Sequence, residues 1–194
     1  MKIKSLGYLW IESTDLSKWR DYGTNILGLQ LAPTMAADGN VYLKMDARPY
    51  RFAVYPGTRD RLAFAGWELG SEEAFAAALE ELRAAGVDFE VLGAEVARQR
   101  RVRAVARLQD PAGATLELYH GADLDYAKFI SPQGIAEFET GFNGNMGLGH
   151  IVLPTKKLAE TRRFYREVLG FADTDYMHFH FSPDPKDPGQ GLHF

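Results

Sequence analysis

The sequence predicts an α+β fold in which repeated β-α-β-β-β units pair into curved mixed sheets. Three observations carry this prediction. A strand-like run followed by a helical pattern occurs twice, 142 residues apart, and a fainter copy lies between the two. Short runs with strand character, separated by turns rich in Gly and Pro, follow the helical patterns. One unit alone would leave a sheet face bare, so two units are expected to pair around a shared cleft.

The repeat keeps its register through both the strand and the helix. Residues 6–11 align without a gap to residues 148–153, so that Tyr8 corresponds to His150. The helical pattern ends at Gly28 in the first copy and at Gly170 in the last, as expected for a C-terminal stop. Repetition at a fixed offset therefore decides the architecture.

The first unit begins with a strand over residues 3–11. Thr14 or Asp15 can cap the helix that follows, which is expected to end near Gly28. Three short strands complete the unit, at residues 29–33, 41–45 and 51–55.

The second unit repeats this order. A strand over residues 65–69 precedes a helix that Ser71 caps and Gly86 ends. Three strands follow, at residues 89–92, 102–108 and 115–119, with a hairpin turn at residues 110–113. The basic run of residues 98–103 is interpreted as a solvated loop or an edge strand.

We expect three parts in the chain. Residues 1–121 form a first domain of two units, and residues 122–145 form an ordered linker whose isolated aromatic side chains pack. Residues 146–194 start a second domain with a strand, a helix and a strand-like run at residues 175–181. That third unit is unfinished, so we expect the second domain to be truncated here and the whole protein to be longer.

Composition limits the class of protein. Of 194 residues, 46% are hydrophobic and 25% charged, as in a soluble globular protein. The sequence has neither a long uncharged apolar run nor a signal peptide, and its net charge of -4 disfavours nucleic acid, so we expect neither a membrane nor a nucleic-acid partner. The absence of cysteine excludes disulfides and thiolate ligands and makes the cytoplasm the expected location.

His150 is the first candidate functional residue. It lies in a predicted strand, where alternation puts His150 and Val152 on one face and Ile151 and Leu153 on the other. A single histidine on an apolar strand is more often a hydrogen-bonded core residue than a metal ligand. The repeat favours the ligand here, because the matching Tyr8 suits packing and does not bind such metals well.

Glu117 is the second informative residue. It alternates with Leu116 and Leu118, so it faces the cleft if the two leucines face the helices. A carboxylate there pairs with a basic neighbour, binds a metal or is solvated at a wide cleft mouth. We favour the first and third alternatives, because Tyr8 and Gly66 at the neighbouring positions offer no further ligand, and we interpret the position as vestigial.

These motifs together resemble a known family. The segments 147–153 and 164–171, with residues 6–8 and 110–117, are similar to the type I extradiol ring-cleaving dioxygenases of the vicinal-oxygen-chelate superfamily, in particular enzymes that act on 2,3-dihydroxybiphenyl. The resemblance covers the whole chain in register. It implies an Fe(II)-dependent oxidoreductase that cleaves a catechol-type diol with O2 in aromatic hydrocarbon catabolism, and a homo-oligomer.

The resemblance also implies roles for individual residues. The first domain is expected to be free of metal, and His150 matches the first iron ligand of a site with two histidines and one glutamate. Val152 and Phe194 match residues that line the substrate pocket. The second histidine, the glutamate and the acid-base residues have no counterpart before residue 194, so no catalytic residue is assigned within the chain.

Two alternatives remain open at this stage. One is a non-catalytic module of the same superfamily that binds a small aromatic or electrophilic molecule in the first domain. The other is an isomerase or lyase site in that domain that uses Glu117.

Overall fold

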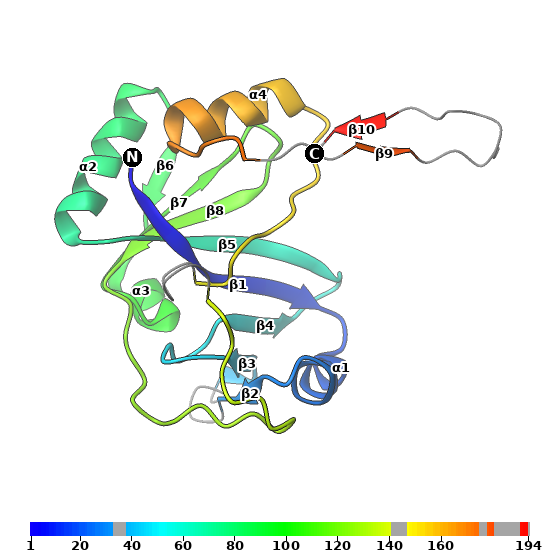
Figure 1. Cartoon of the computed structure of the whole chain (residues 1–194). Coiled ribbons are helices and arrows are strands. Elements are labelled where there is room, and N and C mark those ends of the chain that lie inside the picture. Colours follow the sequence, from blue (N-terminus) through cyan, green and yellow to red (C-terminus); the bar gives the residue numbers. More distant parts are fainter. Residues whose placement is uncertain (33–37, 141–146, 175–177, 181–190, 194) are drawn as a thin grey trace.

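A computed structural model describes residues 1–32, 38–140 and 147–174, together with the backbone of residues 178–180 and 191–193 (Figure 1). The elements, in chain order, are β1 (Ile3–Ser13), α1 (Leu16–Asp21), η1 (Tyr22–Ile26), β2 (Gln30–Leu31), β3 (Val41–Lys44), β4 (Phe52–Pro56), β5 (Arg61–Leu69), α2 (Glu72–Ala84), β6 (Phe89–Val91), α3 (Ala94–Arg100), β7 (Ala104–Gln109), β8 (Thr115–His120), α4 (Leu158–Arg163), η4 (Phe164–Val168), β9 (His178–His180) and β10 (Gly191–His193).

Two β-α-β-β-β units build one eight-stranded mixed sheet. Its strand order is β2-β3-β4-β1-β5-β8-β7-β6. The units meet at the centre, where β1 runs antiparallel to β5. Each of these strands has the last strand of its own unit as a parallel neighbour, β4 beside β1 and β8 beside β5. The predicted α+β fold of paired units is confirmed.

The repeat extends to a helical irregularity. α1 continues into the π-helical turn η1, and α4 continues in the same way into η4. Equivalent hydrogen bonds close both turns, from Leu27 N to Tyr22 O at 3.0 Å and from Leu169 N to Phe164 O at 3.1 Å. The chain then turns at Gly28 and Gly170, both with positive φ, as predicted for the two helix ends.

Predicted caps begin the first two helices. The Asp15 carboxylate accepts from the backbone N–H groups of Ser17 and Lys18, and the Ser71 hydroxyl accepts from that of Ala74. α2 and the helical segment α4–η4 lie over the same side of the sheet (Figure 1). There Phe75 and Phe164 share a hydrophobic core with the sheet, and each large buried side chain stabilises the fold by about 1.5–3 kcal/mol.

Helix α3 contradicts the sequence interpretation. The basic run starts inside this helix, whereas a solvated loop or an edge strand was expected. Ala94 and Glu95 favour helix, and Ala97 is buried against the cleft, so packing and propensity agree. The helix stops at Arg101, which has φ of 59°, and β7 then starts at Ala104.

The described part of the predicted linker packs on the first two units. Lys44 is 2% exposed, and its ammonium binds the Asp125 carboxylate at 2.5 Å and the Ala127 carbonyl at 2.9 Å. The Phe129 and Phe138 rings contact each other, as expected for linker aromatics. Phe142, another aromatic residue of the predicted linker, lies outside the described residues. The domain limits at residues 121 and 145 stay a prediction.

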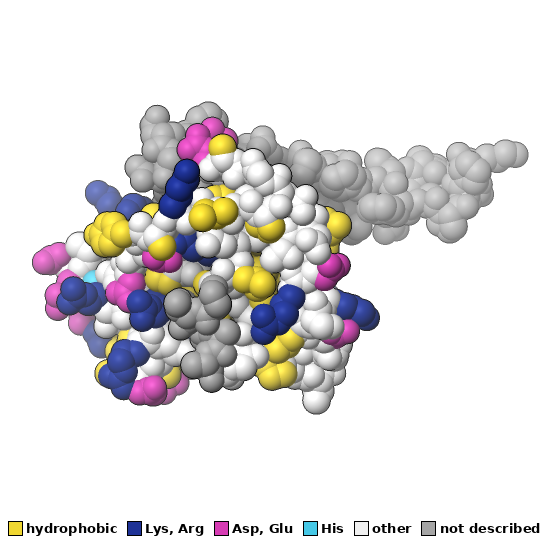
Figure 2. All heavy atoms as spheres, turned by 90° about the horizontal axis from the view of Figure 1, so that it is seen from below, with side chains coloured by type: hydrophobic (Ala, Val, Ile, Leu, Met, Phe, Trp, Pro, Cys, Tyr) yellow, Lys and Arg dark blue, Asp and Glu magenta, His cyan; other side chains and the backbone are white. Residues whose placement is uncertain are grey.

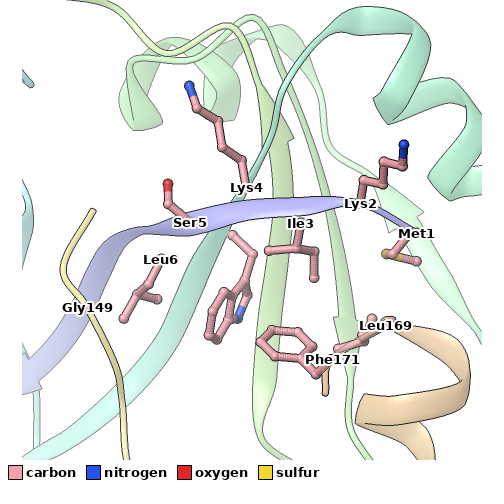
Figure 3. A pocket seen from close by; sticks show the side chains of 11 residues that line it. Met1, Lys2, Ile3, Lys4, Ser5, Leu6, Gly149, Leu169 and Phe171 are labelled. Carbon is pink, nitrogen blue, oxygen red and sulfur yellow. The ribbon is translucent and has the colours of Figure 1, made fainter. Parts of the chain in front are cut away.

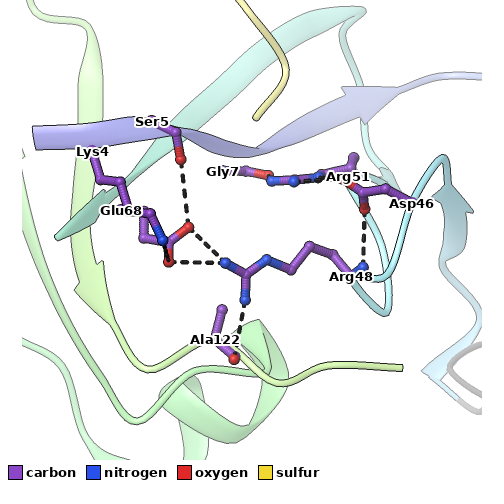
Figure 4. Close-up of polar contacts among 8 residues, drawn as sticks. All are labelled: Lys4, Ser5, Gly7, Asp46, Arg48, Arg51, Glu68 and Ala122. Carbon is purple, nitrogen blue, oxygen red and sulfur yellow. Dashed lines mark hydrogen bonds and ion pairs between the residues drawn. The ribbon is translucent and has the colours of Figure 1, made fainter. Parts of the chain in front are cut away.

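A polar network ties the loop after β3 to the centre of the sheet (Figure 4). Arg48 binds both carboxylate oxygens of Glu68, at 2.8 and 2.7 Å, and donates to the Ala122 carbonyl. Arg51 binds Asp46 and donates to the Gly7 carbonyl at 2.8 Å. These charge-assisted hydrogen bonds fix the loop against β1 and β5.

The surface of the described residues agrees with the balanced composition. Figure 2 shows one face, on which the described Lys and Arg side chains are interspersed with Asp and Glu. Among the described residues, no helix has the length and apolar character that crossing a bilayer requires.

Candidate functional site

Three neighbouring strands of the first two units bring the matching repeat positions together. Tyr8 on β1 pairs with Gly66 on β5, and Gly66 pairs with Glu117 on β8. A Cβ atom on Gly66 would lie 2.3 Å from the Tyr8 ring, so glycine leaves the space that this ring fills. The two units therefore form a shared cleft, as predicted, and Tyr8 lies across its centre.

Glu117 is fully buried in this cleft. Leu116 and Leu118 pack toward the helices, which places the carboxylate on the opposite face, as alternation predicted. Its oxygens accept from Tyr8 Oη at 2.7 Å, Arg100 Nε at 3.1 Å and Arg107 Nη2 at 2.6 Å. Pairing with basic neighbours, one of the favoured alternatives, is confirmed. With its lone pairs used in this way, Glu117 is a structural carboxylate.

Aromatic side chains fill the rest of the cleft. The Trp10 indole donates to Tyr50 Oη at 3.0 Å, and Tyr8 stacks on Tyr119. The space left beside Tyr8 and Arg100 is about 10 Å³, less than a catechol needs. The sequence analysis missed both arginines that bind Glu117, Arg100 and Arg107. For Arg100 the reason is that a basic run gives no sign of which arginine turns inward.

The third unit presents His150 differently from Tyr8. Ile151 and Leu153 pack on the core, whereas His150 is exposed and Val152 is 72% exposed, so the predicted alternation is present. The predicted strand is absent from the described part of this segment. Its one ladder contact there is a parallel bridge from Gly147 to Leu6, and without a hydrogen-bonded neighbour residues 149–153 form no strand.

Two family models match parts of the chain. The model "Dihydroxybiphenyl dioxygenase BphC D1" matches residues 6–57, and "Glyoxalase/Bleomycin resistance protein/Dioxygenase superfamily" matches residues 147–194. The biphenyl-2,3-diol 1,2-dioxygenase of Paraburkholderia xenovorans is 35% identical over all 194 residues. The structure of a halotolerant catechol dioxygenase superposes on 99% of the chain with a TM-score of 0.85 and 32% identity. The chain is thus similar to extradiol dioxygenases in both sequence and fold.

The extradiol dioxygenase relatives are longer than this chain. An iron-dependent extradiol dioxygenase of Rhodococcus jostii is 42% identical over 91% of the chain, which covers 57% of that protein. The chain covers 63% of the Paraburkholderia xenovorans enzyme and 60% of the catechol dioxygenase structure. It therefore spans about three fifths of the length of these relatives.

The structure describes two of the three predicted site residues, His150 and Val152. Among the described residues, no group of three or more His, Asp or Glu side chains could hold a metal ion. His150 offers one imidazole, a suitable iron ligand, and the described residues do not complete a ligand set around it. Phe194 lies outside the described residues. The roles of His150, Val152 and Phe194 stay predictions.

A mainly apolar pocket lies between β1 and the end of the third unit's helix (Figure 3). It has a volume of about 560 Å³, and Ile3, Leu6 and Phe171 are among its lining residues. The described residues that line it include no His, Asp or Glu, and Val152 is not among them either. The pocket therefore offers mainly apolar contact, with Lys2, Lys4 and Ser5 as polar residues among its lining.

Gly147 fixes the entry into the third unit. It has φ of +63°, and a Cβ atom there would lie 2.0 Å from the Leu6 carbonyl oxygen. Gly149 has φ of +86° with no neighbouring atom within 4 Å of a Cβ. We expect Gly149→Ala to cost about 1–2 kcal/mol of unfolding free energy, the penalty of left-handed backbone, and Gly147→Ala clearly more. Urea unfolding of both variants checks this. Equal losses of unfolding free energy would contradict the close contact between Gly147 and the Leu6 carbonyl.

The buried tyrosines predict sensitivity to alkaline pH. Burial, and then the nearby Glu117 carboxylate, raises the pKa of Tyr8 well above its usual value, and burial raises the pKa of Tyr42 to about 12. The unfolded value is about 10. The protonated phenols thus favour the fold fully below pH of about 10, and this stability is lost as the pH rises through the folded values.

Spectrophotometric titration of tyrosine tests this expectation. The buried phenols of Tyr8 and Tyr42 should ionise only as the protein unfolds. Titration of all nine tyrosines near their ordinary pKa in a protein that stays folded would contradict it.

Proposed function

We propose that the whole protein is an iron(II)-dependent extradiol dioxygenase that cleaves a catechol-type, biphenyl-diol-like aromatic ring with O2. The observation that carries the proposal is the 35% identity to a biphenyl-2,3-diol 1,2-dioxygenase over all 194 residues. The relative of 42% identity is named an iron-dependent enzyme, which supports Fe(II) as the cofactor. Cytoplasmic location and a homo-oligomer are part of the same proposal.

The two predicted domains of the chain would then have different roles. Residues 1–121 would form the metal-free domain, because Glu117 is saturated by Tyr8 and two arginines. An isomerase or lyase site at Glu117 gains no support from this arrangement. Residues 146–194 would supply His150 as one iron ligand, after the linker of residues 122–145.

His150 and its neighbours would act by position. The exposed imidazole would give its neutral nitrogen to the iron, and Val152, two residues on with the same exposure, would form part of the pocket wall. Phe194 would line the same pocket. In such sites the iron supplies open positions for a catecholate and O2.

The test is iron content together with ring cleavage, measured on the whole protein. We expect stoichiometric iron, O2 uptake with biphenyl-2,3-diol and 3-methylcatechol, and loss of both rates when a chelator removes the iron. A folded protein that holds iron and consumes no O2 with any vicinal diol would overturn the proposal. A folded protein that binds diols without holding iron would indicate a binding module instead.

A further inference from the structure

The Arg100 side chain lies in the shared cleft of the first two units, against Trp10 and Glu117, as a small-molecule ligand would. Arg100 is the last residue of α3, and it is 6% exposed. We propose that this cleft is built as a receptor for a planar cation: the Arg100 guanidinium fills it in the native protein, and a free guanidinium ion would bind in its place once that side chain is removed. The site is separate from the predicted iron site and does not rest on the proposed function.

Two aromatic rings form the floor of this site. The Trp10 and Phe64 rings lie nearly parallel, with centroids 5.5 Å apart. The Arg100 guanidinium carbon lies 4.0 Å from the centroid of Trp10 and 4.6 Å from that of Phe64. A cation at this distance is attracted by the negative ring faces, and the attraction is strongest where water is excluded.

Hydrogen bonds hold the guanidinium in its plane. Nε and Nη2 point to the Glu117 carboxylate at 3.1 and 3.5 Å, and Nη1 donates to Gln99 Oε1 at 2.7 Å. Donors on one flat fork match these acceptors, whereas the ammonium of a lysine is a point charge. The geometry therefore selects a guanidinium-like cation.

The buried carboxylate of Glu117 carries a negative charge that a cation must compensate. Arg107, with a side chain 37% exposed, binds Oε1 from the solvent side at 2.6 Å. Oε2 is left to Tyr8 and Arg100 within the cleft. A fully buried carboxylate oxygen needs such partners, because an uncompensated buried charge is strongly destabilising.

The experiment removes the Arg100 side chain and adds a free cation in its place. Arg100→Ala should lower Tm, and guanidinium chloride at millimolar concentration should restore much of the loss in a saturable way, with a dissociation constant of roughly 1–10 mM. Sodium chloride at equal ionic strength should not. The wild type should show no gain, because Arg100 fills its site.

Two further variants make the test specific. Arg98→Ala, on the exposed face of the same helix, should leave Tm nearly unchanged and insensitive to guanidinium. Glu117→Gln added to Arg100→Ala should weaken the recovery at least several-fold. Equal recovery by tetramethylammonium, which is not planar, would overturn the selectivity.

The proposal stays testable if Arg100→Ala fails to fold alone. Refolding into millimolar guanidinium should then yield folded protein, while refolding into sodium or tetramethylammonium chloride should not. No saturable guanidinium effect in either format would overturn the proposal.

Discussion

Replacing His150 by alanine in the whole protein is expected to remove iron and lower the ring-cleavage rate by about 100-fold or more. Loss of even an outer partner of a metal ligand costs about 10–100-fold in affinity or activity, and loss of a ligand costs more. The side chain is exposed, so the fold should survive. Iron analysis and O2 uptake, with circular dichroism as the folding check, measure the result.

Val152→Ala is the matched control for this prediction. Val152 shares the exposure of His150 but has no atom that binds metal. It should keep its iron and change the preference among substituted catechols, with each methylene of pocket volume worth about 1–3 kcal/mol. A His150→Ala protein that keeps half of its iron and activity would reject the ligand assignment.

The fold could be predicted because repetition and periodicity can be read directly from the order of the residues. The offset of 142 residues aligns Gly28 with Gly170, and both glycines end their helices in the structure. Alternation also placed Glu117 opposite Leu116 and Leu118. A shift of one residue would move the apolar side chains of a strand from the core face to the other face, so the alternation is strongly constrained.

The partners of Glu117 could not be predicted in the same way. The run at residues 98–103 contains four arginines, and their charges are identical in the sequence. Only the helical turn of α3 sets Arg100 inward while Arg98 stays exposed, and that turn depends on packing of Ala97 in the cleft. A buried carboxylate predicts that a cation is near, but it does not say which one.

The strand predicted around His150 failed for a related reason. Alternation reports which side chains pack on a core, and Ile151 and Leu153 do so. A strand also needs hydrogen-bonded neighbours, which a sequence pattern does not supply. In the described residues the backbone contact of this segment is made at Gly147 and Leu148, both against Leu6.

Glu117→Ala is expected to be the most destabilising substitution in the first cleft, at about 3–5 kcal/mol of unfolding free energy. The carboxylate is 0% exposed, and its loss leaves the buried Arg100 charge without its partner. Tyr8 loses its acceptor at the same time. Urea or thermal unfolding measures the cost.

Two comparisons separate buried charge from lost volume. Glu80→Ala breaks an exposed helix pair with Arg83 and should have little effect, since surface ion pairs contribute little. Glu117→Gln keeps the volume and part of the hydrogen bonding, so it should fall between wild type and Glu117→Ala. If Glu117→Gln were as stable as wild type, volume rather than charge would hold the cleft together. If Glu117→Ala itself cost less than about 1 kcal/mol, the pairing with Arg100 would contribute little to the fold.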